Sequence, residues 1–225
     1  MKKIILFSIV LLYNCGTNEV SSSQATKLPN DIRWVTESPE YSILCEQTYK
    51  NAWDNLSSTL LSADSKSAIV MDLDETVLDN SKYQVDLTNK NETYNPESWS
   101  QWVNLEEAKL VPGAKNFIDK VRETKVKIIF LSNRMHKNLK PTISNMNELG
   151  VVNKNDIFLL RLDKEDKKHV RRNEITSGVG RFKEIGPLKV LGYFGDAKHD
   201  FPKDDEYFQF GKNMFMFPNP MYGKW

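Results

Sequence analysis

The amino-acid sequence predicts an α/β domain with a parallel sheet that is covered by helices on both faces. Five short runs are almost continuously apolar, and the segments between several of them carry apolar residues at helical spacing. A strand with one face in water alternates apolar and polar residues, so continuous runs indicate strands that are buried on both faces. The chain has 225 residues, 40% of them hydrophobic, which is enough for one medium domain with a sizeable core.

The first long helix is predicted to begin at Pro39. Ser38 is a suitable N-cap residue, and proline is favoured at the first helical position. Apolar and aromatic residues then recur at helical spacing as far as Ser62: Tyr41, Cys45, Tyr49, Ala52, Trp53, Leu56 and Leu60. We interpret this stripe as a face of the core rather than a ligand site.

The remaining elements follow from the same two periodicities. Helices are predicted after Pro112 and Gly113, up to about Leu149, where Gly150 provides a left-handed cap, and across the basic segment 164–176. The segment 79–110 is polar and aromatic with weak periodicity, so we expect an insertion above the core. The five predicted strands cover 67–72, 126–131, 156–160, 189–194 and 214–217.

Charge and cysteine content exclude several classes of protein. There are 31 basic and 30 acidic residues, a net charge of +1, which falls to near −1 if a segment containing Lys2 and Lys3 is removed. This balance gives no support for binding a nucleic-acid polymer or an anionic membrane surface. Two cysteines exclude a disulfide framework and a multi-cysteine zinc site, and we expect Cys45 to be a small core residue.

The first residues resemble a targeting segment. An apolar run of ten residues, 4–13, follows two lysines; as a helix it would rise about 15 Å, half of a bilayer core of about 30 Å. We therefore expect a signal peptide over 1–14. Cys15 ends a stretch that resembles a bacterial lipobox, although Asn14 stands where a small residue is usual. We therefore expect that Cys15 carries a lipid, that residues 15–33 form a flexible tether and that the protein lies in the cell envelope. Ordinary secretion, with no role for Cys15, is the alternative.

Candidate functional residues lie where the predicted strands end, the edge at which parallel sheets bind ligands. Asp72 and Asp74 directly follow the first strand, and Asp196 and Asp200 follow the fourth, after Gly195. Neighbouring carboxylates repel one another and favour a cation, and oxygen ligands suit Mg²⁺. A solvated turn is the simpler interpretation of each pair alone.

Two further strand ends offer anion-binding groups. Ser132 could donate to an anion or act as a helix N-cap, and these interpretations are equally good on the motif alone. The basic stretch 164–172 is in general a solvated helix face, but one lysine at a helix start could hold a phosphoryl group as a point charge.

Taken together, the four strand ends resemble those of the haloacid dehalogenase-like phosphohydrolases, and more closely the class C acid phosphatases, which are bacterial outer-membrane lipoproteins that include 5′-nucleotidases. The resemblance runs from about residue 34 to the C-terminus. The segment 175–189 departs from the family, because it is longer and richer in glycine than the usual connection. Lys168 is preferred over Lys167 as the motif lysine because Lys-x-x-Arg-Arg matches there, although an extra residue lies just upstream. The segments that carry the resemblance are 34–41, 72–81, 98–103, 111–113, 130–134, 168–172, 195–201, 217–223 and Trp225.

This resemblance implies a haloacid dehalogenase-like sheet with a small, mostly helical N-terminal and cap region, forming one domain over 34–225. It also implies a Mg²⁺-dependent phosphomonoesterase that hydrolyses nucleoside 5′-monophosphates and related esters, including nicotinamide mononucleotide. In such an enzyme Asp72 is the nucleophile that forms an aspartyl-phosphate, and Asp74 is the general acid and base. The metal ligands are the side chains of Asp72 and Asp196 and the main-chain oxygen of Asp74.

The resemblance assigns the surrounding residues as well. Ser132, Asn133 and Lys168 would hold the phosphate, and Asp200 would orient Lys168 or a water on the metal. Trp99 and Tyr222 would sandwich the substrate ring, with packing onto the core as the alternative for Trp99. For Trp102 packing is the preferred interpretation.

Two other functions compete with this one. One is a broad acid phosphatase with little preference for nucleotides. The other is a surface lipoprotein that binds haem or a host ligand through a vestigial site, against which the intact set of Asp72, Asp74, Lys168 and Asp196 argues. The family tendency towards dimers suggests a homodimer.

Overall fold

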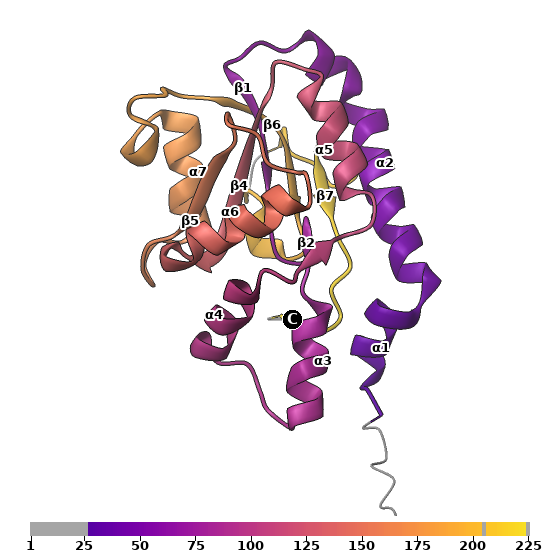
Figure 1. Ribbon diagram of the computed structural model, residues 1–225. Coiled ribbons are helices and arrows are strands. Elements are labelled where there is room, and N and C mark those ends of the chain that lie inside the picture. Colours follow the sequence, from indigo (N-terminus) through magenta and orange to yellow (C-terminus); the bar gives the residue numbers. More distant parts are fainter. Residues whose placement is uncertain (1–26, 204–205, 224–225) are drawn as a thin grey trace, which may run out of the picture.

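A computed structural model describes residues 27–203 and 206–223. Its central sheet has five parallel strands in the order β5-β4-β1-β6-β7 (Figure 1). This confirms the predicted fold class. The strands are β1 (Ser67–Met71), β4 (Lys127–Met135), β5 (Ile157–Arg161), β6 (Lys189–Gly195) and β7 (Met214–Met216).

The central strand shows why the apolar runs are continuous. All five residues of β1 are buried, and they alternate between two hydrophobic clusters, Ile69 and Met71 facing one and Ala68 and Val70 the other. The helices that contribute to the first cluster include α2 (Pro39–Ser62), α5 (Ala114–Arg122) and α6 (Leu139–Glu148), and the second cluster includes Ile175 of α7 (Lys168–Ser177). Both faces of the sheet are therefore covered.

The N-terminal part contains one helix more than expected. The backbone N–H of Glu40 donates to the Ser38 hydroxyl, 3.1 Å away, so α2 begins at Pro39 as predicted. A short helix, α1 (Asn30–Glu37), precedes it and buries Ile32 and Val35. Residues 30–33 thus belong to the folded part rather than to the expected tether. The expected signal peptide and Cys15 lie outside the described residues.

The segment 79–110 holds two helices that weak periodicity had concealed, α3 (Ser81–Lys90) and α4 (Pro96–Leu105). In the chain these helices come between two short strands, β2 (Leu78–Asp79) and β3 (Lys109–Leu110), which pair with each other as an antiparallel ribbon. Asn95 caps α4 by accepting hydrogen bonds from the backbone N–H groups of residues 97 and 98, at 3.1 and 2.9 Å. We call residues 78–110 the cap. Figure 1 shows α3 and α4 at one end of the sheet.

Two boundaries differ from the predictions by more than one residue. β4 continues to Met135 rather than ending at 131, and α7 begins at Lys168 rather than at 164. The side chain of Asp163 accepts hydrogen bonds from the backbone N–H groups of Glu165 and Asp166, at 2.7 and 3.0 Å, and so holds a turn before the helix. Three single-turn helices complete the fold: η1 (His136–Asn138), η2 (Gly180–Phe182) and η3 (Lys198–Asp200).

The two remaining expectations concern Cys45 and membrane spans. Cys45 is a free, fully buried cysteine of the first hydrophobic cluster, as its place on the helical stripe predicted. Among the residues that the structure describes, none of the helices has the length and apolar character needed to cross a bilayer.

Candidate active site

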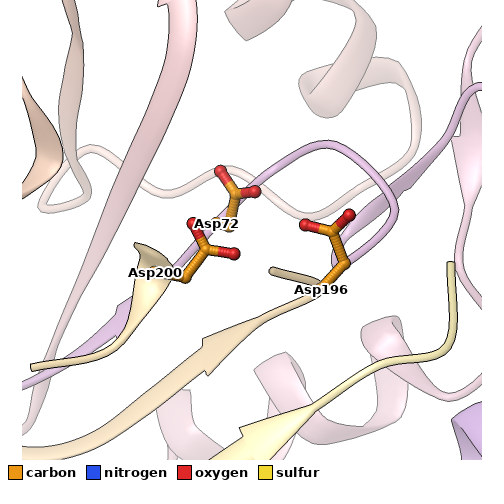
Figure 2. Close-up of side chains that lie close together, drawn as sticks. All are labelled: Asp72, Asp196 and Asp200. Carbon is orange, nitrogen blue, oxygen red and sulfur yellow. The ribbon is translucent and has the colours of Figure 1, made fainter. Parts of the chain in front are cut away.

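Three carboxylates converge where β1 and β6 end. Asp72 follows β1, Asp196 follows β6 and Asp200 lies in η3, and their ligand atoms lie within 4.8 Å of one another (Figure 2). Gly195 makes this approach possible, because a Cβ atom there would lie 2.4 Å from the Cβ of Asp200. Three of the four aspartates predicted at the ends of the first and fourth strands therefore lie together. The side chain of the fourth, Asp74, lies outside this cluster.

Lys168 supplies the positive charge in this cluster. It is the first residue of α7, and its Nζ lies 2.7 Å from Asp72 Oδ1 and 2.5 Å from Asp200 Oδ1. Lys167, the alternative, points its Nζ to the main-chain oxygen of Lys164 at the surface. The other oxygen of Asp200 accepts a hydrogen bond from the backbone N–H of Ala197, 2.9 Å away. Both carboxylate oxygens of Asp200 are thus engaged, one by Lys168 and the other by the backbone.

The cluster carries more negative than positive charge in a buried place. Burial raises the pKa of Asp72 well above its usual range; Lys168 opposes this shift and Asp200 adds to it. Burial and then Asp200 raise the pKa of Asp196 to about 6. Although burial works against it, Asp72 and Asp200 raise the pKa of Lys168. One ammonium group does not balance three carboxylates, so the arrangement favours a further cation.

The oxygen atoms present fit a hard divalent cation. Lys168 contacts Asp72 and Asp200 through their Oδ1 atoms. Asn219 Nδ2 donates to Asp196 Oδ2 at 2.7 Å and orients that carboxylate. The second oxygens of Asp72 and Asp196 are therefore the side-chain atoms best suited to hold an ion, and carboxylate oxygens are what Mg²⁺ prefers.

The side chain of Asp74 lies in a different environment from that of Asp72. Its Oδ1 accepts hydrogen bonds from Arg134 Nε at 2.9 Å and Asn80 Nδ2 at 3.1 Å. Its Oδ2 accepts one from the Ser132 hydroxyl at 3.3 Å. The two carboxylates after the first strand therefore have different partners. Asp72 contacts Lys168 in the acidic cluster, whereas Asp74 accepts hydrogen bonds from an arginine, an amide and a hydroxyl.

Ser132 and Asn133 lie within β4 rather than after it. Ser132 is fully buried, and its hydroxyl also accepts a hydrogen bond from the backbone N–H of Arg134 at 3.0 Å, so it does not cap a helix. The side chain of Asn133 is engaged on both sides: Arg171 donates to its Oδ1 at 2.8 Å, and its Nδ2 lies 3.1 Å from His199 Nε2.

The aromatic residues of the cap differ in burial. Trp102 is 3% exposed and donates from Nε1 to Asn80 Oδ1 at 2.9 Å, which agrees with the packing role expected of it. Trp99 is half-buried, with its ring edge-on to that of Tyr83 at 5.1 Å. From the C-terminal segment, the Tyr222 hydroxyl donates to the carboxylate of Glu75.

The site also includes Glu75, Asn80 and Arg134, for which no role was predicted. All three belong to segments that carried the family resemblance, and all are at most 2% exposed. Fully buried charged side chains are rare and need partners. The signal that identifies them is burial, which depends on contacts between distant parts of the chain.

Comparisons with known proteins agree with this geometry. The family model of the HAD superfamily, subfamily IIIB (acid phosphatase), matches residues 13–225. The fold is similar to that of the class C acid phosphatase from Bacillus anthracis with tungstate bound, at 31% identity and a TM-score of 0.73 over 86% of this chain and 84% of that one. A second structure of the Bacillus anthracis enzyme matches at 30% identity and a TM-score of 0.72, with the same coverage.

Proposed function

The chain belongs to the acid phosphatases of HAD subfamily IIIB, and we propose that it is a Mg²⁺-dependent phosphomonoesterase acting on nucleoside 5′-monophosphates and related esters. The observation that carries the proposal is the position of Asp72, beside Lys168 and across from Asp196, at the carboxyl edge of the sheet. A binding protein needs neither a buried carboxylate with a free oxygen nor a lysine aimed at it.

In the first step, an oxygen of Asp72 attacks phosphorus in line with the ester oxygen. The bond from phosphorus to that oxygen breaks, Asp74 gives its proton to the leaving oxygen, and the phosphoryl group remains on Asp72. In the second step, Asp74 takes a proton from water, and the water oxygen attacks phosphorus. Inorganic phosphate leaves and Asp72 is regenerated. The different surroundings of the two carboxylates support this division of roles.

Lys168 and Ser132 are suited to hold the non-bridging oxygens, because one is an ammonium group beside Asp72 and the other a hydroxyl beside Asp74. We expect Asn133 to contribute to phosphate binding too. Asp72, Asp196 and the main-chain oxygen of Asp74 would hold Mg²⁺, which offsets the repulsion between an anionic nucleophile and a phosphate dianion. A tetrahedral oxyanion, tungstate, is bound in the Bacillus anthracis relative, which supports an oxyanion site here.

The proposed specificity for a substrate with a flat ring rests on Trp99 and Tyr222. Both are connected to the loop after β1. The Trp99 ring packs on Arg134, which donates to Asp74, and the Tyr222 hydroxyl donates to Glu75. Stacking accepts any flat ring, which suits purines, pyrimidines and the nicotinamide of nicotinamide mononucleotide.

The proposal extends to the cell envelope. A lipid on Cys15 would anchor the enzyme to the outer membrane, with the domain beginning at α1, near residue 30, and acting as a monomer or a homodimer. Metabolic labelling with a fatty acid tests this part: label on the wild-type chain and none on Cys15→Ser is the expected result, and equal label on both would contradict it.

The main experiment is a panel of phosphate monoesters assayed with EDTA and with added Mg²⁺. The panel contains nucleoside monophosphates, nicotinamide mononucleotide and a small aryl phosphate. We expect EDTA to abolish hydrolysis, Mg²⁺ to restore it and the nucleotides to have the higher kcat/KM. Hydrolysis that EDTA leaves unchanged would contradict the metal, and equal kcat/KM across the panel would contradict the nucleotide specificity.

A further inference from the structure

Arg134 is a buried arginine that the mechanism above does not use. It lies in β4, two residues after Ser132, and is 2% exposed. Its Nε and one terminal nitrogen both lie 2.9 Å from Asp74 Oδ1. A guanidinium group placed in the interior needs a charged partner and hydrogen bonds for its remaining donors, and Asp74 is the only carboxylate paired with it in the described part of the chain.

The rest of the guanidinium is fixed from two further elements. One terminal nitrogen donates to the Thr142 hydroxyl of α6 at 3.1 Å, and the other donates to Asn80 Oδ1 at 3.2 Å. The central carbon lies 5.6 Å from the centroid of the Trp99 ring, which packs against it from α4. Asn80 Oδ1 in turn receives Nε1–H of Trp102. The guanidinium is thus held between the sheet, α6 and the cap.

These contacts place the two carboxylate oxygens of Asp74 in different environments. Oδ1 is engaged by Arg134 and Asn80, whereas the one hydrogen bond to Oδ2 from the residues described is the 3.3 Å contact of the Ser132 hydroxyl. A general acid has to present its proton within hydrogen-bond reach of the leaving oxygen. The oxygen free to do so is Oδ2.

We propose that Arg134 is a positioning residue that binds Asp74 Oδ1, leaves Oδ2 as the atom that transfers the proton, and ties this geometry to the cap through Trp99. The inference rests on the proposed role of Asp74 as general acid. Arg134 itself does not touch the reacting atoms. Because misplacing a reacting group by about 1 Å can cost about 10²-fold in rate, loss of this support weakens proton transfer specifically.

The readout is therefore the dependence of rate on the leaving group. p-Nitrophenyl phosphate releases a stable anion and needs little help from an acid, whereas benzyl phosphate, of similar size, releases an alkoxide that has to be protonated. The quantity to compare is kcat/KM, which reports the steps up to formation of the phosphoenzyme even where its hydrolysis limits kcat.

The experiment measures both esters with Arg134→Gln, Arg134→Lys, Asp74→Asn and the Asp74→Asn, Arg134→Gln double variant, all with Mg²⁺. We expect Arg134→Gln to lower kcat/KM for benzyl phosphate by about 10²-fold and for p-nitrophenyl phosphate by much less. Arg134→Lys keeps the charge but not the fork of donors, so it shows the same selective loss at a smaller size. The double variant is no worse than Asp74→Asn alone.

Arg122→Gln is the matched control, since it breaks another arginine–carboxylate pair, that with Asp156 at 2.7 Å, which joins the end of α5 to the loop before β5. It leaves the ratio of the two kcat/KM values unchanged. Equal losses on both esters in the Arg134 variants would overturn the inference, and Arg134→Lys decides it if Arg134→Gln does not fold. If Asp74→Asn itself shows no selectivity, the acid role of Asp74 fails instead.

Discussion

The sheet edge and the cap form two sides of one site, and they differ in the kind of side chain that they contribute. The sheet edge consists of charged groups, three of them buried (Asp72, Lys168 and Asp200) and one half-buried (Asp196), and its negative groups outnumber the positive one. The cap presents aromatic rings and hydrogen-bonding groups that are already paired, such as Trp102 with Asn80. The first side has an excess of negative charge that a cation could balance, whereas the groups of the second side are paired with one another. We infer that chemistry resides at the sheet edge and that the cap selects the substrate and steadies Asp74.

The sharpest way to break this division is to change the nucleophile. Asp72→Asn keeps the shape of the side chain but removes the attacking oxygen anion, so kcat should fall by roughly 10⁴- to 10⁶-fold for every ester, as when a nucleophile or its partner is removed. Asp54→Asn, at an exposed ion pair on α2, is the control and should retain full turnover. Near-wild-type turnover of Asp72→Asn would refute the mechanism.

The lysine at the start of α7 provides the next largest effect. Lys168→Met leaves Asp72 and Asp200 without their shared counter-ion, and kcat should fall by roughly 10²–10³-fold. Lys167→Met is the neighbouring control, because Nζ of Lys167 lies at the surface on the carbonyl of Lys164, and its kcat should not change. Steady-state kinetics of both variants decide between the two lysines, and the reverse result would show that the wrong one has been assigned.

The cap should influence binding rather than chemistry. Trp99→Ala should raise KM for a nucleoside monophosphate by an amount equivalent to about 1–3 kcal/mol, the usual contribution of stacking on one base. For a small aryl phosphate the rise in KM should be smaller. Equal rises for both substrates would mean that Trp99 only packs against Tyr83 within the cap and against Arg134 of the sheet.

The charge excess at the sheet edge predicts a dependence of stability on pH and metal. The folded-state pKa of Asp196 is raised to about 6 from 3.8, by burial first and then by Asp200. The folded state therefore favours its protonated form, and the stability that this carboxyl contributes is present below pH 3.8 and lost as pH rises through about 6.

Thermal unfolding of the EDTA-treated protein measures this effect. The melting temperature should fall as pH rises from about 4 to about 6.5, and Mg²⁺ should raise it more at the upper end, because the cation binds ionised carboxylates. Asp196→Asn should flatten both trends in comparison with the wild type. A Mg²⁺ effect that is the same size at both ends would count against a metal bound by this carboxylate.

The predicted sheet was correct because buried strands leave a local signal. The run Ser67–Met71 is apolar on both faces, and β1 lies at the centre of the sheet with both faces covered. The cap helices had no such signal, because α3 and α4 bury only three residues each and their buried residues do not form a regular apolar stripe. α1 was missed for the same reason, since it buries only Ile32 and Val35.

The site was predictable in its residue types but not in its pairings. Acidic residues at two strand ends were sufficient to expect that Asp72 and Asp196 meet, because parallel strands share one carboxyl edge. The pairing of Asp74 with Arg134 joins residues 60 apart in the chain, and nothing near either residue indicates it. The same holds for Tyr222 and Glu75, which only the return of the C-terminal segment to the first loop brings together.

The most direct test of the account is to trap the covalent intermediate. The protein is mixed with excess substrate and Mg²⁺, quenched in acid after a fraction of a turnover and treated with borohydride, which reduces an acyl phosphate to an alcohol. We expect peptide mass spectrometry to find homoserine in place of Asp72, and none when substrate or Mg²⁺ is omitted. An unmodified Asp72 in a sample that has released the alcohol in a burst, or a modified carboxylate elsewhere, would contradict the central claim.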